Sequence, residues 1–242
     1  ADIPIEEKIP RSKPEQLQAV RSGAAVLDVA GLSSFLAALR YPLHFLDFET
    51  IGYGIPRFAG MAPYDQLPFQ YSCHVLESPQ ATLQHREYLA AGSGDCRPEL
   101  AERLLADLGR RGSILAFNQG FEKARLVELA AFLPECAAAV EQLLDRFVDL
   151  KDAFTKYYYH PEFHGSFSLK DVLPVLVPTM SYAGMAVADG VGAQAAYARL
   201  GDEKTPTSEK QALRQNLLEY CRQDTFAMVA LLRALEKRVA EV

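Results

Sequence analysis

The chain has 242 residues, 49% of them hydrophobic, so it is long enough to bury one sizeable core. Its 25 Lys and Arg residues against 31 Asp and Glu residues give a net charge of −6, which argues against a protein that grips nucleic acid by bulk positive charge. No stretch reaches the roughly 18 apolar residues of a membrane span, and the four scattered cysteines lack the paired spacing of a zinc or iron–sulfur site.

The first 40 residues predict an arm and short helices that pack on a main domain at 41–242. We expect 1–13 to be extended, a short helix from Pro14 to about Arg21, and another at 32–39. This acidic, Pro-rich start does not resemble a signal peptide, so a soluble, cytoplasmic protein is expected. Because the first residue is Ala1 and not Met, the chain could be an excised piece that follows a further N-terminal domain.

The next part of the chain predicts three strands in succession. Apolar or alternating residues favour strands at 43–49, 68–77 and 83–90, with a long Gly- and Pro-rich loop at 50–68 and a hairpin connection at 78–82. The loop follows the first strand directly, so it is either a gate over a site or only an elaborate connection. Three consecutive strands suggest an antiparallel meander.

Helices then alternate with short strands. We expect helices at 98–109, 121–132, 136–144 and 150–158, a further one capped by Ser168, and a long final helix at 208–239. Short buried strands are expected at 113–118 and 146–149. This pattern predicts the α/β class, with three antiparallel strands, then parallel strands, and helices on both faces of the sheet.

Two acids interrupt the first strand. Asp47 and Glu49 are two residues apart, so they point to the same side of the sheet, inside a run that is otherwise apolar. Burying a carboxylate without a partner is costly, and the usual solutions are a basic partner or a metal ion. A structural ion pair, or a strand end at the surface, is the alternative interpretation.

A third acid lies in the sequence Asn118-Gln119-Gly120-Phe121-Glu122. Asn118 ends a buried strand, Gly120 permits a tight turn, and Glu122 falls in the first turn of a helix. A negative charge is favoured there by the helix dipole, and this is the simpler explanation of Glu122 taken alone.

A fourth acid occupies a core position of the last helix. A stripe at steps of three and four predicts the buried face, and it contains Leu213, Leu217, Tyr220, Met228, Leu231 and Leu235. Asp224 stands where this stripe needs an apolar residue. Tyr220 lies four residues earlier on the same face, so both side chains can reach one point. Neutralisation by Arg222 or Lys170, or a stripe that leaves the core at this turn, would also explain Asp224.

Four carboxylates from three separate segments point to divalent cations. Magnesium and manganese prefer oxygen ligands, and two such ions about 3.5–4 Å apart can hold both the attacking and the leaving oxygen of a phosphodiester. We therefore expect two Mg²⁺ or Mn²⁺ ions bound by Asp47, Glu49, Glu122 and Asp224.

These motifs resemble the DEDD, or proofreading-type (DnaQ-like), exonuclease superfamily, whose fold is ribonuclease H-like. The order D-x-E, N-x-x-F with a following acid, and Y-x-x-x-D carries the resemblance over most of the chain. Tyr220, four residues before Asp224, resembles the tyrosine branch, and Glu122 departs from the usual Asp. The chain is also similar to an uncharacterised bacterial family of predicted nucleases, often found at the C-terminal end of larger proteins.

The resemblance implies a role for each matching residue. Asp47 would bridge two metal ions, Glu49 and Asp224 would complete one site, Glu122 would support the other, and Tyr220 would orient the attacking water. The expected substrate contacts are Thr50, Ile51, Asn118, Phe121 and Lys170. The implied reaction is hydrolysis of the last phosphodiester at the 3′ end of a nucleic acid, single-stranded by expectation. The alternative is a catalytically weak or inactive nuclease-like module that binds nucleic acid or a protein.

An aromatic segment at 156–170 allows two interpretations. Its tyrosines and phenylalanines could form a platform for stacked bases, but such residues more often anchor a core or a loop. His160 and His164 are separated by Pro161, and no further His or Cys completes a zinc set, so both are expected not to bind metal.

Overall fold

The structure is a computed structural model, and it describes residues 14–241. Its centre is a five-stranded mixed sheet with the strand order β4-β3-β2-β5-β6. The strands are β2 (Leu43–Gly52), β3 (Gln66–Leu76), β4 (Gln84–Leu89), β5 (Ser113–Ala116) and β6 (Phe147–Asp149). β2, β3 and β4 pair antiparallel, whereas β5 and β6 continue the sheet parallel to β2. The predicted meander followed by parallel strands is therefore confirmed.

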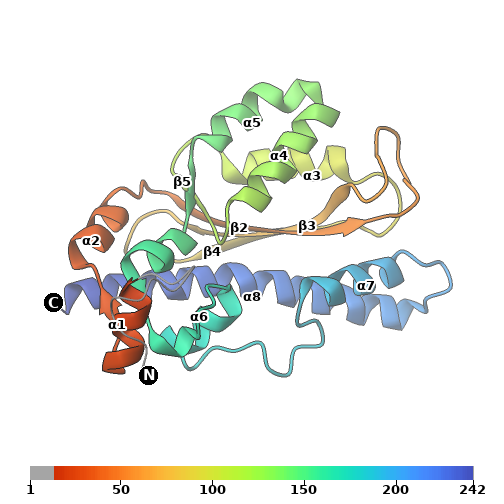
Figure 1. Ribbon diagram of the computed structural model, residues 1–242. Coiled ribbons are helices and arrows are strands. Elements are labelled where there is room, and N and C mark those ends of the chain that lie inside the picture. Colours follow the sequence, from red (N-terminus) through yellow and green to blue (C-terminus); the bar gives the residue numbers. More distant parts are fainter. Residues whose placement is uncertain (1–13, 242) are drawn as a thin grey trace.

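Helices cover both faces of this sheet (Figure 1). One layer contains α3 (Arg97–Leu108), α4 (Gly120–Phe132) and α5 (Ala137–Leu144). The other contains α6 (Leu169–Leu176), α7 (Gly190–Leu200) and α8 (Thr207–Ala240), with α2 (Val29–Ala37) against α8. The long α8 runs along β2 and β3. Within residues 14–241, no helix has the length and apolar character required to cross a membrane.

A second, two-stranded sheet joins the N-terminal part to the middle of the chain. β1 (Val26–Leu27) pairs with β7 (Tyr158–Tyr159), beside α1 (Pro14–Ser22). The predicted helix at 150–158 is wrong at its end, because a π-helical turn at Ala153–Tyr157 leads into β7, where two buried aromatic residues suit a paired strand. Short 3₁₀ helices lie at Pro134–Cys136 and Pro161–Phe163. The arm expected at 1–13 lies outside the described residues, and the domain division at residue 40 stays a prediction.

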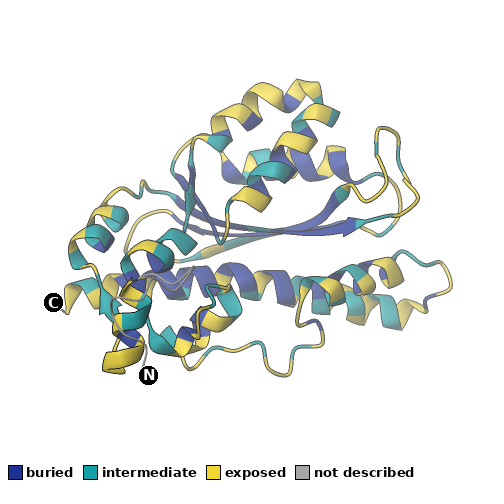
Figure 2. Ribbon diagram, in the orientation of Figure 1, coloured by how far each residue is buried: buried dark blue, intermediate teal, exposed yellow. Residues whose placement is uncertain are grey.

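β2 connects the two halves of the core. As the central strand it is covered on both sides, so it is buried along almost its whole length, its polar residues included (Figure 2). Leu46 and Phe48 pack with α3 and α4, whereas Leu43 and Phe45 pack with α6 and α8. Because side chains alternate along a strand, Asp47 and Glu49 follow Phe45 onto the face that α8 covers.

Candidate metal centre

β2 carries its two acids beyond the end of the neighbouring strand. β5 pairs with β2 only along Leu43–Phe45, so Asp47 and Glu49 stand beside the turn that follows β5. On the other side, the pairing of β2 with β3 shifts between Glu49 and Thr50. Irregularities of this kind bend a strand and re-aim its side chains, and they are frequent next to active sites.

α8 brings a third acid to the same place. Carboxylate oxygens of Asp47, Glu49 and Asp224 all lie within 4.8 Å of one another. Glu49 and Asp224 are each 7% exposed, and Asp47 is half-buried. The stripe on α8 therefore stays inside the core at Asp224, and the expected convergence of acids from β2 and α8 is observed.

The three acids repel one another in a site with little water. Burial, followed by the charges of Asp224 and Glu49, raises the pKa of Asp47 well above its usual range. Burial and the charge of Asp224 raise the pKa of Glu49 to about 8. Burial also raises the pKa of Asp224 to about 6, although a hydrogen bond from Tyr182 offsets part of this effect.

No basic side chain neutralises this group directly. Among residues 14–241, none of the three acids forms an ion pair, so the ion-pair interpretation is not supported. Lys170 is near enough for its charge to lower the pKa of Glu49 and Asp224, but Arg222 has no such effect on either. The three acids thus have raised pKa values and no paired cation. Their carboxylate oxygens are the kind of ligand that a divalent ion such as Mg²⁺ prefers, so the residues present fit such an ion.

Two neighbouring donors were not expected from the sequence. The hydroxyl of Tyr182 donates to Asp224 Oδ1 at 2.6 Å, and the thiol of Cys221 is 3.6 Å from Asp47 Oδ2, a distance at which it donates weakly. Cys221 lies one residue after Tyr220 on the buried face of α8. Tyr182 lies in the loop between α6 and α7, where no periodic pattern marks it.

Tyr220 and Lys170 form the next part of the centre. Lys170 Nζ donates to the Tyr220 hydroxyl at 3.2 Å and to the backbone oxygen of Ala188. The same ammonium group lies 5.2 Å from the ring centroids of both Tyr182 and Tyr220. Tyr220 is therefore held beside the acids by a cation, and the expected contact of Lys170 with a substrate stays a prediction.

The start of α7 lies against Glu49. A Cβ atom built on Gly190 would be 4.0 Å from Glu49 Oε2. Asp189 caps this helix by accepting from the Gly192 N–H at 2.7 Å. The positive end of the helix dipole favours a charge on Glu49, whereas the nearby Asp189 carboxylate raises its pKa.

Glu122 is buried but does not belong to this close group. It is 3% exposed, and its Oε2 has no hydrogen-bond partner among the described residues. Burial raises its pKa to about 8, and the charge of Asp149 adds to the effect. Its own charge raises the pKa of Asp47. Glu122 is thus electrostatically coupled to the centre, but its role as a metal ligand stays a prediction.

The turn before α4 depends on Asp149. The carboxylate of this residue accepts from the backbone N–H groups of Asn118 at 2.9 Å, Gln119 at 3.1 Å and Lys151 at 3.1 Å. Asn118 has a φ of 81°, a conformation that Asn tolerates better than most residues. Asp149 lies at the end of β6, and its hydrogen bonds connect that strand to the turn that follows β5. This turn leads into α4, whose first turn places Glu122 in the core.

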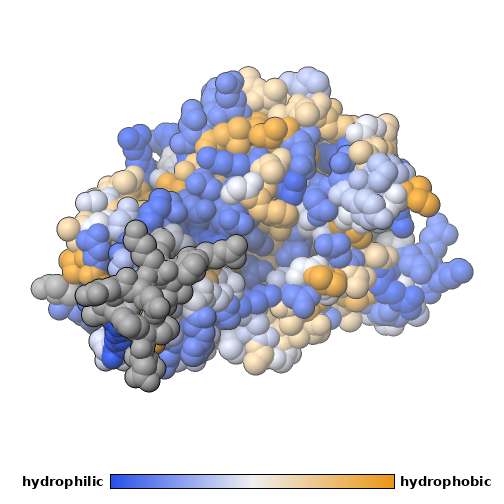
Figure 3. All heavy atoms as spheres, in the orientation of Figure 1, coloured by the Kyte–Doolittle hydropathy of each residue, from blue (hydrophilic) through white to orange (hydrophobic). Residues whose placement is uncertain are grey.

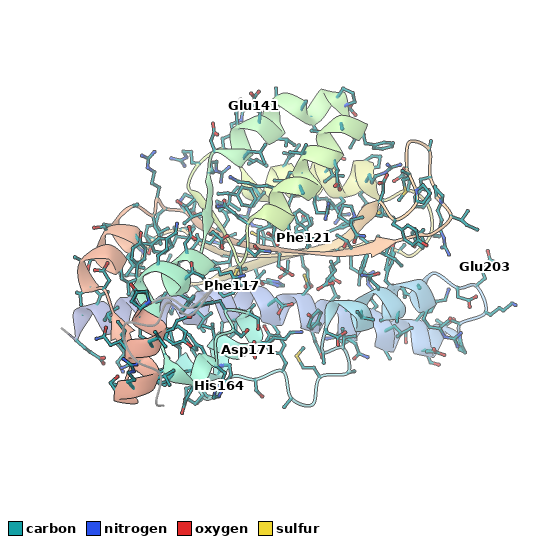
Figure 4. The ribbon with its side chains drawn as sticks, in the orientation of Figure 1. Phe117, Phe121, Glu141, His164, Asp171 and Glu203 are labelled. Carbon is teal, nitrogen blue, oxygen red and sulfur yellow. The ribbon has the colours of Figure 1, made fainter. Side chains whose placement is uncertain are left out.

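The remaining expected contacts lie around the centre. Thr50 donates to Gln66 Oε1 at 2.8 Å, and both Thr50 and Ile51 are 5% exposed. Phe121 is 36% exposed where α4 meets the sheet (Figure 4), and the Arg125 guanidinium lies 4.7 Å from its ring centroid. Contact of Thr50, Ile51, Asn118 or Phe121 with a substrate stays a prediction.

The aromatic segment at 156–170 serves the core instead of a binding surface. Tyr158, Tyr159 and Phe163 are buried in one hydrophobic cluster with Phe154. The interpretation as core anchors is therefore the right one for these residues. The group of potential metal ligands found between residues 14 and 241 consists of the three acids, and the absence of metal binding by His160 and His164 stays a prediction.

The molecule is open toward solvent between its two helical layers. Figure 3 shows a hollow on this face, with hydrophilic residues gathered around it.

Comparison with known proteins finds two uncharacterised relatives. The chain is 27% identical over 210 residues to "Uncharacterized protein MG366 homolog" of Mycoplasma pneumoniae, covering 77% of this chain and 31% of the relative. It is 25% identical over 226 residues to "Uncharacterized protein UU173" of Ureaplasma parvum serovar 3, covering 85% of this chain and 33% of the relative. The chain thus spans about a third of the length of these relatives. No solved structure matches it.

The family match covers residues 44–168, more than half of the chain. It includes Asp47, Glu49 and Glu122 and ends before Asp224. The chain belongs to the family described as "Domain of unknown function (DUF2779)".

Proposed function

We propose that this domain is a metal-dependent 3′–5′ exonuclease that hydrolyses the terminal phosphodiesters of DNA or RNA. The observation that carries the proposal is the approach of Asp47, Glu49 and Asp224 oxygens to within 4.8 Å in a largely buried site. Carboxylates this close repel one another unless a cation or a proton lies between them, and oxygen-only donors suit Mg²⁺ or Mn²⁺.

The order of motifs supports a place in the DEDD superfamily. The acids of β2, the acid at the start of α4 and the Tyr220–Asp224 pair of α8 follow the order of that superfamily. A mixed sheet with three antiparallel strands, two parallel ones and a long helix across it is compatible with a ribonuclease H-like arrangement, which we include in the proposal.

The chain offers ligands for two ions. Asp47, Glu49 and Asp224 would hold one, and Asp47 would share a second with Glu122, whose buried Oε2 is without a partner among the described residues. When bound, the ions supply positive charge for the attacking and leaving oxygens of the phosphodiester.

The surrounding residues position the reactants. The Tyr220 hydroxyl, held by Lys170 at 3.2 Å, orients the attacking water through a hydrogen bond. Lys170 also presents a positive charge toward the substrate phosphate. Thr50 and Ile51 contact the terminal nucleotide, and Asn118 and Phe121 contact the strand beside it.

One observation favours a second candidate function, a module that binds nucleic acid or a protein without cutting. Glu122 lies outside the close acid group, so a second metal site is less complete than the first. A non-cutting module has no need of divalent ions at the four acids. Titration of the protein with Mn²⁺ therefore separates the two candidates.

The direct test is digestion of 5′-labelled single-stranded DNA and RNA with Mg²⁺ or Mn²⁺. The proposal expects shortening from the 3′ end by the wild type and none by Asp47→Asn. Asp145→Asn, which changes an exposed acid at the end of α5, is the matched control and should digest like the wild type. Equal digestion by Asp47→Asn would assign the activity to a contaminant, and the absence of digestion by the wild type would refute the exonuclease.

A further inference from the structure

A second pocket lies on the other flank of α8. It has a volume of about 430 Å³ and lies between β3, β4, α8 and the loop after α6. Its lining includes His74, His85, Ser181, Arg222, Gln223 and Phe226. None of these residues belongs to the acid group, and the volume falls within the range of small-molecule sites, about 300–1,000 Å³.

One wall of the pocket is built from a buried polar network. Thr225 Oγ1 is 2.7 Å from Ser72 Oγ and 2.8 Å from His74 Nδ1, and Ser72 Oγ is 2.9 Å from His85 Nε2. Ser72 and Thr225 are fully buried, and His74 is 3% exposed. The two imidazole rings, 4.4 Å apart between centroids, are therefore held in a defined orientation.

The pocket has one strong positive charge. Burial lowers the pKa of His74 to about 3 and of His85 to about 4, so both rings are neutral at physiological pH. Arg222 is exposed and forms no ion pair with any residue in 14–241, in a chain whose net charge is −6. The lining carboxylate of Glu219 accepts a hydrogen bond from the Gln215 amide at 2.7 Å. Burial raises the pKa of the nearby Glu87 carboxyl and the charge of Arg222 offsets part of this effect, but no ion pair between the two occupies the guanidinium group, so it can still accept an anion.

An aromatic ring stands beside this charge. Phe226, on α8, is 39% exposed. Its centroid is 5.6 Å from that of His74. Gln223 adds an amide that can both donate and accept hydrogen bonds. An exposed ring, a guanidinium and an amide together suit a flat aromatic ligand that carries a negative group.

We propose that this pocket binds a nucleotide, with its base against Phe226, its phosphate at Arg222 and a base edge at Gln223. The ligand would be either an upstream nucleotide of the strand being digested or a free mononucleotide, and this identification rests on the proposed function. Gln223 and Asp224 are neighbours on α8, as are Ser181 and Tyr182 in the adjoining loop. The pocket and the acid centre therefore lie on neighbouring faces of α8.

Binding measured with EDTA present tests the pocket without cleavage. The probes are a fluorescent single-stranded oligothymidine and thymidine monophosphate, added to the full chain. Phe226→Leu keeps an apolar side chain but removes the ring, and it should weaken binding about five- to a hundredfold, the loss of one base–aromatic stack. Arg222→Gln should weaken binding and reduce its dependence on salt.

Two variants serve as controls. Phe226→Tyr keeps the ring and should bind like the wild type. Arg233→Gln removes another exposed arginine of α8, outside the pocket, and should have little effect. Weaker binding of the oligonucleotide alone identifies an upstream nucleotide of a strand, whereas weaker binding of both probes identifies a site for a single nucleotide.

The proposal is overturned if the wild type binds neither probe, or if folded Phe226→Leu and Arg222→Gln proteins bind both as the wild type does. Thermal melting of each variant establishes that it is folded. Digestion with Mn²⁺ separates this outcome from failure of the proposed function. Normal digestion with unchanged binding by the variants refutes only the pocket, whereas pocket-dependent binding without digestion refutes only the exonuclease.

Discussion

The acids of β2 and α8 and the acid of α4 are similarly buried but differently surrounded. Glu49 and Asp224, each 7% exposed, share one space with Asp47, whereas Glu122, 3% exposed, has an oxygen without a partner among the described residues. Asp47 and Glu49 are placed by the alternation of side chains along β2, and Asp224 is placed by the packing of α8. Both kinds of placement follow directly from apolar patterns in the sequence. Glu122 is placed by a turn that a carboxylate on another strand holds. In the proposed centre, the ligand set of one metal ion is therefore more complete than that of the other.

The largest expected loss of nuclease activity is the one caused by Asp47→Asn. Asp47 lies between the two acid regions, because Glu49, Asp224 and Glu122 all raise its pKa. Loss of a residue that only supports a metal ligand typically costs 10–100-fold in activity or affinity, so loss of this shared ligand should cost more than about a hundredfold. The rate of nucleotide release measures it. A loss of less than about tenfold would contradict the central position of Asp47.

Glu122→Gln should have a smaller effect. If Glu122 acts at the edge of the centre, this change should reduce activity or Mn²⁺ affinity by about 10–100-fold. Kinetics and calorimetric titration measure the two quantities. An effect as large as that of Asp47→Asn would make Glu122 a full ligand, and the absence of an effect would remove it from the centre.

Asp149→Ala tests the turn that carries Glu122. The change removes the charged acceptor of the backbone N–H groups of Asn118 and Gln119 at this partly exposed turn, and it should lower the free energy of unfolding by about 1–3 kcal/mol. Urea denaturation measures the difference, with Asp145→Ala as the exposed control. Unchanged stability of Asp149→Ala would show that other contacts hold the turn.

The smallest expected effect is a pH dependence of the metal-free protein. Glu49 and Glu122 have folded-state pKa values of about 8, above the ordinary value of 4.5, so the folded protein binds more protons than the unfolded one. The unfolding free energy is therefore highest below the ordinary pKa and falls as pH rises toward about 8. The three histidines whose pKa is lowered, His44, His74 and His85, act oppositely, but only below about pH 6.5.

The window from about pH 7 to about pH 8.5 lies above that of the histidines, so the change in stability there reports the buried acids with raised pKa values, Asp47 included. With EDTA, the melting temperature should fall by a few degrees across this window, and Glu49→Gln should flatten the fall. Mn²⁺ should raise the melting temperature more at the upper end. A melting temperature that increases with pH in EDTA would show that these acids are ionised in the folded protein.

The sequence predicts those residues of the centre that lie in a strand or helix with a clear apolar pattern. Asp47 and Glu49 interrupt an apolar strand, and Asp224 replaces a core residue in the stripe of α8, so each conflicts with its surroundings. Such conflicts point to function because a buried carboxylate needs compensation. The antiparallel meander and the parallel strands after it followed from the same apolar runs and from their alternation with helices.

The remaining part depends on loops and short contacts that leave no periodic signal. Tyr182 reaches Asp224 from a loop, and α7 begins beside Glu49 with a sequence rich in Gly and Ala, GVGAQAAYARL. No pattern in the sequence marks either feature. The motif also groups Glu122 with the other acids, because a motif specifies the order of residues but not how far a turn carries a side chain.

The most direct test of the central claim is anomalous diffraction from crystals of the protein soaked in Mn²⁺. We expect a manganese peak bound by carboxylate oxygens of Asp47, Glu49 and Asp224, and loss of that peak in Asp224→Asn crystals. Absence of a peak between these three acids in the wild-type crystals, with the ion at another place or bound nowhere, would contradict it.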